Sequence, residues 1–258
     1  MRANYIATMK SVIGTRAEQQ DSAFQKVNDQ GVIAIVCDGM GGLESGRLAS
    51  IATIEKFKEL CEKKDPSEAF PSFFLKAVDI LDEFVFHLKS ESGERLGAGT
   101  TLASAAIEND NLFWLSIGDS RLYILRGDEF VQVTRDHNYF LRLDQMRQEK
   151  EINESQYQAE AIRGEALISF VGMGGIEVMD LSNAPFKLLP KDTLLLTTDG
   201  LYKALSDEEI KQCLYITDIE EAIATLINKA SEKAQKAQDN TTCVIIRYNE
   251  EDALNETY

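Results

Sequence analysis

The sequence of 258 residues contains few histidines and cysteines, which narrows the metal and redox chemistry that it can support. There are two histidines and four cysteines, and no two cysteines form a CxxC pair. A zinc site built from His and Cys side chains is therefore disfavoured. We expect Cys37, Cys61, Cys213 and Cys243 to be reduced thiols of a cytoplasmic protein.

Long apolar runs and an excess of basic residues are also lacking. No segment approaches the ~20 consecutive apolar residues of a membrane-spanning helix, and residues 1–10 have no apolar core of a signal peptide. The 27 Lys and Arg residues against 43 Asp and Glu give a formal net charge of -16. Nucleic acids and anionic membranes bind basic surfaces, so we expect neither as a partner.

What the sequence does contain is a repeated pattern in which a predicted strand carries an aspartate at one end. The run Val32–Cys37 is rich in β-branched residues and predicts a buried strand. Four strands share the pattern, and their aspartates are Asp38, Asp119, Asp199 and Asp239. If these strand ends meet, the carboxylates need a counter-charge. Hard divalent cations such as Mg²⁺ or Mn²⁺ prefer such oxygen ligands.

Two simpler explanations of this pattern compete with a metal site. Asp-Gly is the commonest hairpin-turn dipeptide, so each pair taken singly is better explained as a turn. The glycines after Asp38 also form a weak phosphate-loop pattern. That pattern lacks the lysine of GxxxxGK[ST] and the spacing of GxGxxG, so nucleotide binding is set aside. Recurrence of the aspartate at four strand ends favours a metal cluster.

The order of predicted elements indicates an α+β fold in which helices cover packed antiparallel sheets. The polar segment 138–165 is expected to be a surface excursion, partly helical, with Asn153 and Gln156 as a capping pair. Residues 1–248 are expected to form a single domain, followed by a frayed acidic tail at 249–258. Strands are predicted at 4–8, 23–27, 32–37, 100–107, 111–117, 121–126, 129–133, 166–171, 177–181, 193–198 and 242–248, and helices at 43–64, 67–89, 207–215 and 218–237.

Seven short motifs occur in order along nearly the whole chain. They are Gly-x-Arg…Gln-Asp (14–21), Asp-Gly-Met-Gly-Gly (38–42), Gly-Thr-Thr (99–101), Gly-Asp-Ser-Arg (118–121), Thr-x-Asp-His (134–137), Thr-Asp-Gly-Leu (198–201) and Asp-Asn-Thr-Thr (239–242). With these motifs the chain resembles the metal-dependent serine/threonine protein phosphatases of type 2C (PPM type), in their compact bacterial form. The resemblance implies a four-layer αββα sandwich, two central antiparallel sheets flanked by helix pairs, and a surface flap at about 138–165.

The resemblance also implies which residues bind metal. Asp38 matches a carboxylate that bridges two Mn²⁺ or Mg²⁺ ions, and Gly39 matches a residue whose carbonyl binds one of them. Asp199 and Asp239 match ligands of the other ion. Asp119 matches an aspartate that, together with Asp199, holds a third metal in bacterial members.

The implied reaction is the hydrolysis of phosphoserine and phosphothreonine monoesters by a hydroxide that bridges the metals. Asp21 matches an acid that orients the metal-bound water, and Arg16 matches the arginine that binds the substrate phosphate. Three positions depart from the common pattern. Met40 stands where many eukaryotic members have a histidine proposed as general acid, Gln20 stands where many have Glu, and Lys191 stands where Gly is usual.

The resemblance implies phosphoproteins as partners, a cognate serine/threonine kinase in the same cell, and action as a monomer. Two alternatives to this enzyme are less consistent with the sequence. A catalytically weak, metal-binding regulatory module of the same fold would be expected to lack a core residue, whereas Asp38, Asp199, Asp239 and Arg16 are all present. A two-metal phosphodiesterase or nuclease is disfavoured by the acidic composition.

Overall fold

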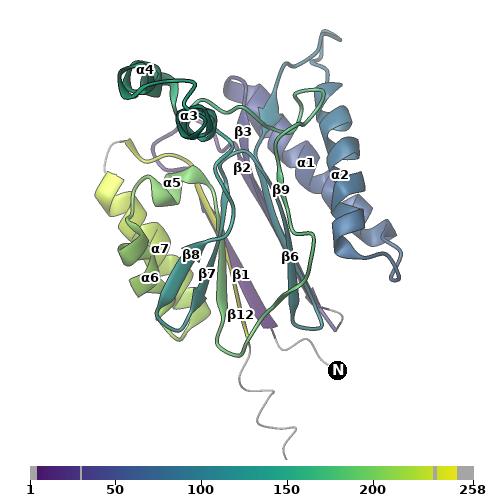
Figure 1. Ribbon diagram of the computed structural model, residues 1–258. Coiled ribbons are helices and arrows are strands. Elements are labelled where there is room, and N and C mark those ends of the chain that lie inside the picture. Colours follow the sequence, from purple (N-terminus) through teal and green to yellow (C-terminus); the bar gives the residue numbers. More distant parts are fainter. Residues whose placement is uncertain (1–4, 30, 235–236, 249–258) are drawn as a thin grey trace, which may run out of the picture.

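The computed structural model describes residues 5–29, 31–234 and 237–248. Two antiparallel β-sheets pack face to face, and a pair of helices covers the outer face of each sheet (Figure 1). The predicted αββα sandwich is therefore confirmed. The acidic tail predicted at 249–258 lies outside the described residues.

The first sheet has five strands, all paired with antiparallel neighbours, in the order β1-β12-β11-β7-β8. Helices α6 and α7 cover this sheet, and a short helix, α5, follows β11 directly (Figure 1). The elements are β1 (Tyr5–Val12), β7 (Arg121–Arg126), β8 (Glu129–Gln132), β11 (Thr193–Thr197), β12 (Thr241–Tyr248), α5 (Asp199–Tyr202), α6 (Asp207–Leu214) and α7 (Ile219–Ala234).

The second sheet has seven strands, and five of them follow the order β10-β6-β5-β3-β2. The short strands β4 and β9 pair with β3 and β6. Helices α1 and α2 cover its outer face, and Pro71 in the first turn of α2 fits a start at Phe70, three residues later than predicted. The elements are β2 (Asp21–Asn28), β3 (Gly31–Met40), β4 (Gly99–Thr100), β5 (Leu102–Glu108), β6 (Asn111–Ile117), β9 (Asp180–Leu181), β10 (Phe186–Lys187), α1 (Leu43–Lys63) and α2 (Phe70–Phe86).

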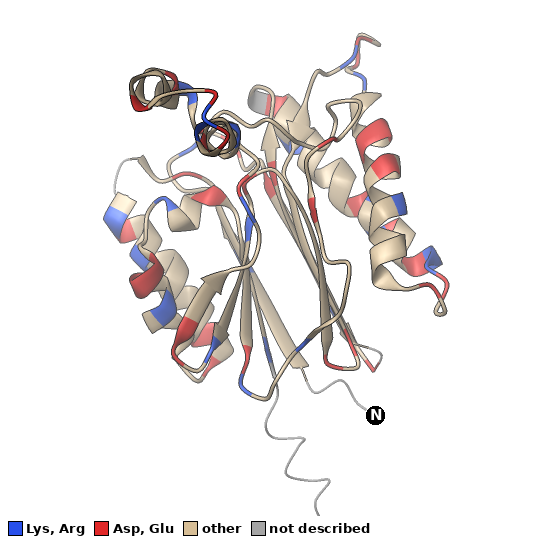
Figure 2. Ribbon diagram, viewed as in Figure 1, with Lys and Arg blue, Asp and Glu red and all other residues tan. Residues whose placement is uncertain are grey.

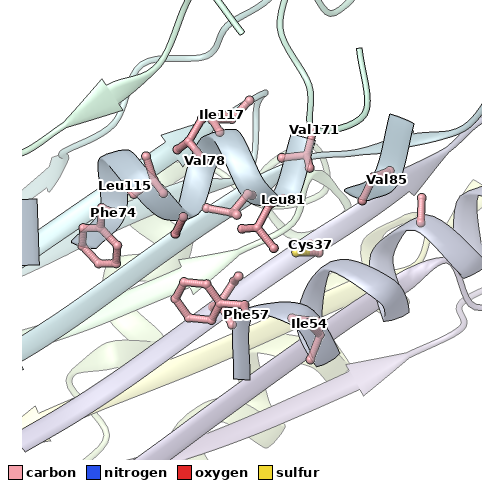
Figure 3. Close-up of a cluster of buried hydrophobic side chains, with 14 of the residues drawn as sticks. Cys37, Ile54, Phe57, Phe74, Val78, Leu81, Val85, Leu115, Ile117 and Val171 are labelled. Carbon is pink, nitrogen blue, oxygen red and sulfur yellow. The ribbon is translucent and has the colours of Figure 1, made fainter. Parts of the chain in front are cut away.

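Three hydrophobic layers hold the sandwich together. The first lies between α1, α2 and the second sheet, where the rings of Phe57 and Phe74 and the side chain of Leu81 are fully buried (Figure 3). The second fills the space between the sheets, and the third packs α6 and α7 against the first sheet. Each sheet is thus buried on both faces, which makes the strand ends rigid places from which to present polar side chains.

The polar segment predicted as a surface excursion forms two helices at one end of the sandwich (Figure 1). They are α3 (Tyr139–Gln148) and α4 (Glu154–Glu160), followed by a 3₁₀ turn, Ala161–Arg163. The predicted capping pair is confirmed: the Asn153 side chain accepts from the Gln156 N–H, and the Gln156 side chain accepts from the Asn153 N–H. We call residues 138–165 the flap segment.

Two strand predictions were wrong. Residues 166–171 form isolated bridges at Leu167 and Val171 instead of a strand, and the strand predicted at 177–181 is reduced to β9. The backbone of 166–171 bonds to residues 137–139 and Thr100, and the glycines that follow donate backbone hydrogen bonds to Asp82 on α2. Among the described residues, no helix is both long and apolar enough to cross a lipid bilayer.

Candidate active site

Antiparallel pairing brings the aspartates together at one edge of the sandwich. In the second sheet, β2 begins at Asp21, which is paired directly with Asp38 near the end of β3. In the first sheet, β11 ends just before Asp199, and its neighbour β12 begins just after Asp239. Asp119 lies in the turn that crosses from β6 to β7, between the two sheets. Acidic residues accordingly gather at these strand ends and at the start of α5, below the flap segment (Figure 2).

The peptide groups of Asp38 are held by the Gly-Thr-Thr motif. The carbonyl oxygen of Asp38 accepts hydrogen bonds from the Thr101 N–H and the Thr100 hydroxyl, both at 2.8 Å. Its N–H donates to the Thr101 hydroxyl at 2.9 Å. Because both the N–H and the carbonyl group of Asp38 are hydrogen-bonded, the fold sets the direction of the Asp38 side chain.

Gly39 and Gly46 bring β3 and α1 unusually close together. A Cβ atom at Gly39 would lie 2.0 Å from the Gly46 carbonyl oxygen, and one at Gly46 would lie 2.7 Å from the Gly39 carbonyl oxygen. Neither position can carry a side chain without displacing the helix. Glycine at position 46 therefore leaves the Gly39 carbonyl uncovered by a side chain from α1.

Burial and mutual repulsion raise the pKa values of three of these carboxyl groups. Burial raises the pKa of Asp38 well above its usual range, and the charges of Asp21, Asp199, Asp119 and Asp239 raise it further. Burial also raises the pKa of Asp21 to about 7, although hydrogen bonds from Thr198 and Thr242 partly offset the effect. For Asp119, burial and the charge of Asp199 raise the pKa to about 6. The five aspartates thus form one electrostatic cluster.

Two cationic side chains face this cluster from its rim. Arg16, in the loop between β1 and β2, places Nη2 2.5 Å from Asp239 Oδ2, and its side chain is 58% exposed. Lys203, directly after α5, places Nζ 2.8 Å from Asp199 Oδ2. Burial lowers the pKa of Lys203, but Asp199 and Glu165 outweigh burial and raise it above its usual value.

The loop that carries Arg16 is fixed by the Asp-Asn-Thr-Thr motif. The Asn240 amide group donates to the carbonyl oxygens of Ile13 and Glu18 and accepts from the Gln20 N–H. At Gly14 a Cβ atom would lie 2.4 Å from the Asp239 carbonyl oxygen, so the two segments touch through their backbones. Arg16 and Asp239 therefore sit together, although they are 223 positions apart.

The turn that carries Asp119 is held from two sides. The buried ring of His137 accepts a hydrogen bond at Nδ1 from the backbone N–H of Gly118 at 3.2 Å. The backbone N–H of His137 donates to the Gly118 carbonyl oxygen at 2.9 Å. On the other side, the Tyr202 hydroxyl donates to the Asp119 carbonyl oxygen at 3.1 Å. The Thr-x-Asp-His motif thus serves to fix this turn.

The chemistry of the cluster fits a hard divalent cation, because every side-chain donor is a carboxylate oxygen. The Oδ1 atom of Asp21 is buried and has no hydrogen bond of good geometry within the described part of the chain. As they stand, however, no three Asp, Glu, His or Cys side chains of the described residues form a ready-made metal site. Asp199 and Asp239 point toward Lys203 and Arg16 instead.

The structure thus brings all seven predicted site residues to one edge: Arg16, Asp21, Asp38, Gly39, Asp119, Asp199 and Asp239. The sequence prediction missed Lys203 and Thr198, whose hydroxyl donates to Asp21 Oδ2 at 2.7 Å. Thr198 begins the Thr-Asp-Gly-Leu motif (198–201), so the sequence contains a signal for it. Lys203 is four residues after Asp199, but no helix was predicted there to make that spacing informative.

Comparisons with known proteins bear on this arrangement. The family model described as "Protein phosphatase 2C" matches residues 10–239. The chain belongs to the protein phosphatase 2C family. The predicted family is thereby confirmed, and with it the class of enzyme, a serine/threonine protein phosphatase.

Relatives and solved structures agree with this family. The protein phosphatase PhpP of Streptococcus pneumoniae is 28% identical over 258 residues, which cover 96% of this chain and 99% of the relative. A serine/threonine phosphatase of S. agalactiae is 25% identical with a TM-score of 0.79, covering 94% of this chain and 99% of that chain. The PstP catalytic domain in complex with two manganese ions is 26% identical with a TM-score of 0.73, covering 94% and 97%.

Proposed function

We propose that this protein hydrolyses phosphoserine and phosphothreonine monoesters of proteins at the aspartate cluster, with divalent metal ions as cofactors. The observation that carries the proposal is the meeting of five aspartates from both sheets, three of them with raised pKa values, beside the exposed Arg16. A cluster of like charges is costly to the fold unless cations bind to it. The relative PstP, whose structure contains two manganese ions, supports the choice of metal.

In this proposal Asp38, the Gly39 carbonyl, Asp199 and Asp239 would hold two Mn²⁺ or Mg²⁺ ions, and Asp119 with Asp199 could hold a third. When bound, such ions lower the pKa of water and stabilise negative charge on the phosphoryl group. Asp199 and Asp239 would exchange their present cationic neighbours, Lys203 and Arg16, for these ions.

The other residues would bind and orient the reactants. Arg16 is exposed and held by one carboxylate, so its guanidinium can turn to bind two phosphate oxygens. Asp21 would orient the attacking water by accepting a hydrogen bond at Oδ1, since Oδ2 is engaged by Thr198. The Met40 thioether carries no proton to donate, so we assign protonation of the leaving group to water.

We also propose the cellular setting from the relatives and the thiols. Two relatives carry the names serine/threonine phosphatase and protein phosphatase, and we expect phosphoproteins as substrates here, with an opposing serine/threonine kinase in the same cell. All four cysteines are free, as expected for a reducing compartment such as the cytoplasm.

The test is release of phosphate from p-nitrophenyl phosphate and from a phosphothreonine peptide, with Mn²⁺ and with EDTA. We expect turnover that depends on Mn²⁺, and loss of turnover in Asp199→Ala. The regulatory-module alternative predicts Mn²⁺ binding without turnover, and the nuclease alternative predicts preference for a diester such as bis-p-nitrophenyl phosphate. Either result would overturn the proposal.

A further inference from the structure

Lys203 links the aspartate cluster to the flap segment. It is the first residue after α5, and the i,i+4 spacing places its Nζ atom 2.8 Å from Asp199 Oδ2. The same Nζ atom lies 3.2 Å from Glu165 Oε2, at the end of the flap segment. One ammonium group therefore touches both a site carboxylate and the flap segment.

Lys203 and Arg121 differ in the carboxylates that they contact. The Nζ atom of Lys203 contacts Asp199 Oδ2 and Glu165 Oε2. Arg121, two residues after Asp119, is bound through two nitrogens to Asp136, and its guanidinium stacks on the ring of Tyr202 at 3.4 Å. Lys203 is thus the cation in contact with Asp199 within the described residues.

We propose that Lys203 is a positioning residue whose ammonium group is a built-in counter-charge for Asp199, competing there with a divalent cation and tying the flap segment to the site. The inference rests on the proposed function, because it takes Asp199 to be a metal ligand. It goes further by stating that the protein supplies one of the positive charges itself.

The physical reason is competition for the same oxygen. A protonated lysine donates hydrogen bonds but cannot share its position with a metal ion, and two positive charges about 4 Å apart repel each other. A divalent cation bound to Asp199 must therefore displace Lys203 or bind more weakly beside it. Removal of the lysine charge should strengthen binding of the weakest ion by roughly tenfold or more, because Lys203 is only partly screened by solvent.

The metal experiment is a calorimetric titration of the EDTA-treated, dialysed full chain with Mn²⁺. We expect Lys203→Gln to bind one more Mn²⁺ than the unmodified chain, or to bind its weakest Mn²⁺ at least about tenfold more tightly. Lys203→Arg retains the charge and should resemble the unmodified chain. Lys76→Gln is the matched control: Lys76 lies on α2, outside the cluster, and pairs with Glu68, and the substitution removes the same charge.

Identical titrations for Lys203→Gln and the unmodified chain would overturn the proposal, and so would an equal shift in Lys76→Gln. If Lys203→Gln does not fold, Lys203→Met is measured in its place. Turnover of p-nitrophenyl phosphate by the unmodified chain is recorded separately. A protein that turns over substrate while Lys203→Gln leaves the titration unchanged refutes this inference and leaves the proposed function intact.

Hydrogen exchange supplies the second readout. Lys203→Gln and Glu165→Gln both break the contact between Lys203 and the flap segment, whereas Glu165→Gln leaves the contact with Asp199. We expect amides of α3 and α4 to exchange a few-fold faster in both variants than in Lys76→Gln. The calorimetric change is expected in Lys203→Gln alone. Unchanged exchange in both variants would refute the tie to the flap segment.

Discussion

Two regions of this protein bury carboxylates and treat them in opposite ways. Asp82 on α2 is 5% exposed, and three backbone N–H groups of the glycine loop 172–175 donate to it at 2.6–3.3 Å. In the aspartate cluster, Asp21 accepts a hydrogen bond from the Thr198 hydroxyl, but burial and the charges of neighbouring aspartates raise the pKa values of both Asp21 and Asp38. In the first region, backbone N–H groups of the chain bind the carboxylate. In the second region, much of the negative charge has to be balanced by an added cation.

The partners of a buried carboxylate distinguish a structural carboxylate from a functional one. Asp82 fixes a loop in which Gly172, Gly174 and Gly175 all have positive φ, so its hydrogen bonds shape the backbone. In the cluster, burial raises the pKa of Asp38, and the charges of the neighbouring aspartates raise it further. Substitutions should therefore damage stability in the first region and activity in the second.

The largest expected effect is on catalysis in the cluster. Asp38→Asn should lower kcat/KM for p-nitrophenyl phosphate with Mn²⁺ by about 10²–10³-fold or more, because it removes charge that organises the transition state. The EDTA-treated variant should melt no lower than the unmodified chain, since one repelling charge is gone. A variant that keeps its turnover, or that loses as much stability as we expect for substitution of Asp82, would contradict this difference between the two regions.

Substitution of Asp82, which holds the glycine loop, should reduce stability rather than activity. Asp82→Ala leaves three backbone N–H groups without their acceptor and should lower the free energy of unfolding by about 2–4 kcal/mol, measured by urea denaturation. Asp79→Ala, an exposed position on the same helix, is the control and should change little. Equal stability of the two variants would mean that these hydrogen bonds contribute nothing.

Metal binding should stabilise the cluster alone. At 100 times its dissociation constant, Mn²⁺ should add about 2.7 kcal/mol to the free energy of unfolding and raise the melting temperature in step with concentration. The gain should persist in Asp82→Ala and shrink in Asp38→Asn. Melting that is indifferent to both Mn²⁺ and EDTA would count against the whole cluster.

The smallest expected effect is the pH dependence of the EDTA-treated chain. The folded-state pKa values of Asp21 and Asp119 are raised to about 7 and about 6, so the folded state binds more protons than the unfolded state between about pH 4 and pH 7. Stability should therefore fall as pH rises through this range. Asp21→Asn should flatten the curve, whereas stability that increases with pH would show that the raised pKa values are wrong.

Many of the elements that carry these two regions could be predicted from the sequence, but contacts between distant residues could not. Local patterns identified β3, β11 and the capping pair Asn153 and Gln156, because each depends on neighbours within a few residues. The same reasoning wrongly predicted a strand at 166–171, whose backbone hydrogen bonds go instead to residues 137–139 and to Thr100, all far away in the sequence. It also passed over Lys203, whose partner Glu165 lies in a separate element.

The sequence by itself determined the family, the sandwich of antiparallel sheets and the set of aspartates at the strand ends, because motifs and periodicity depend on residues that are close together in the sequence. Only the tertiary structure decided which carboxylate meets backbone N–H groups, which meets other carboxylates and which meets Lys203 or Arg16. Electrostatic environment depends on distances of a few ångströms between residues that can be 223 positions apart. Spacing along the chain does not contain those distances.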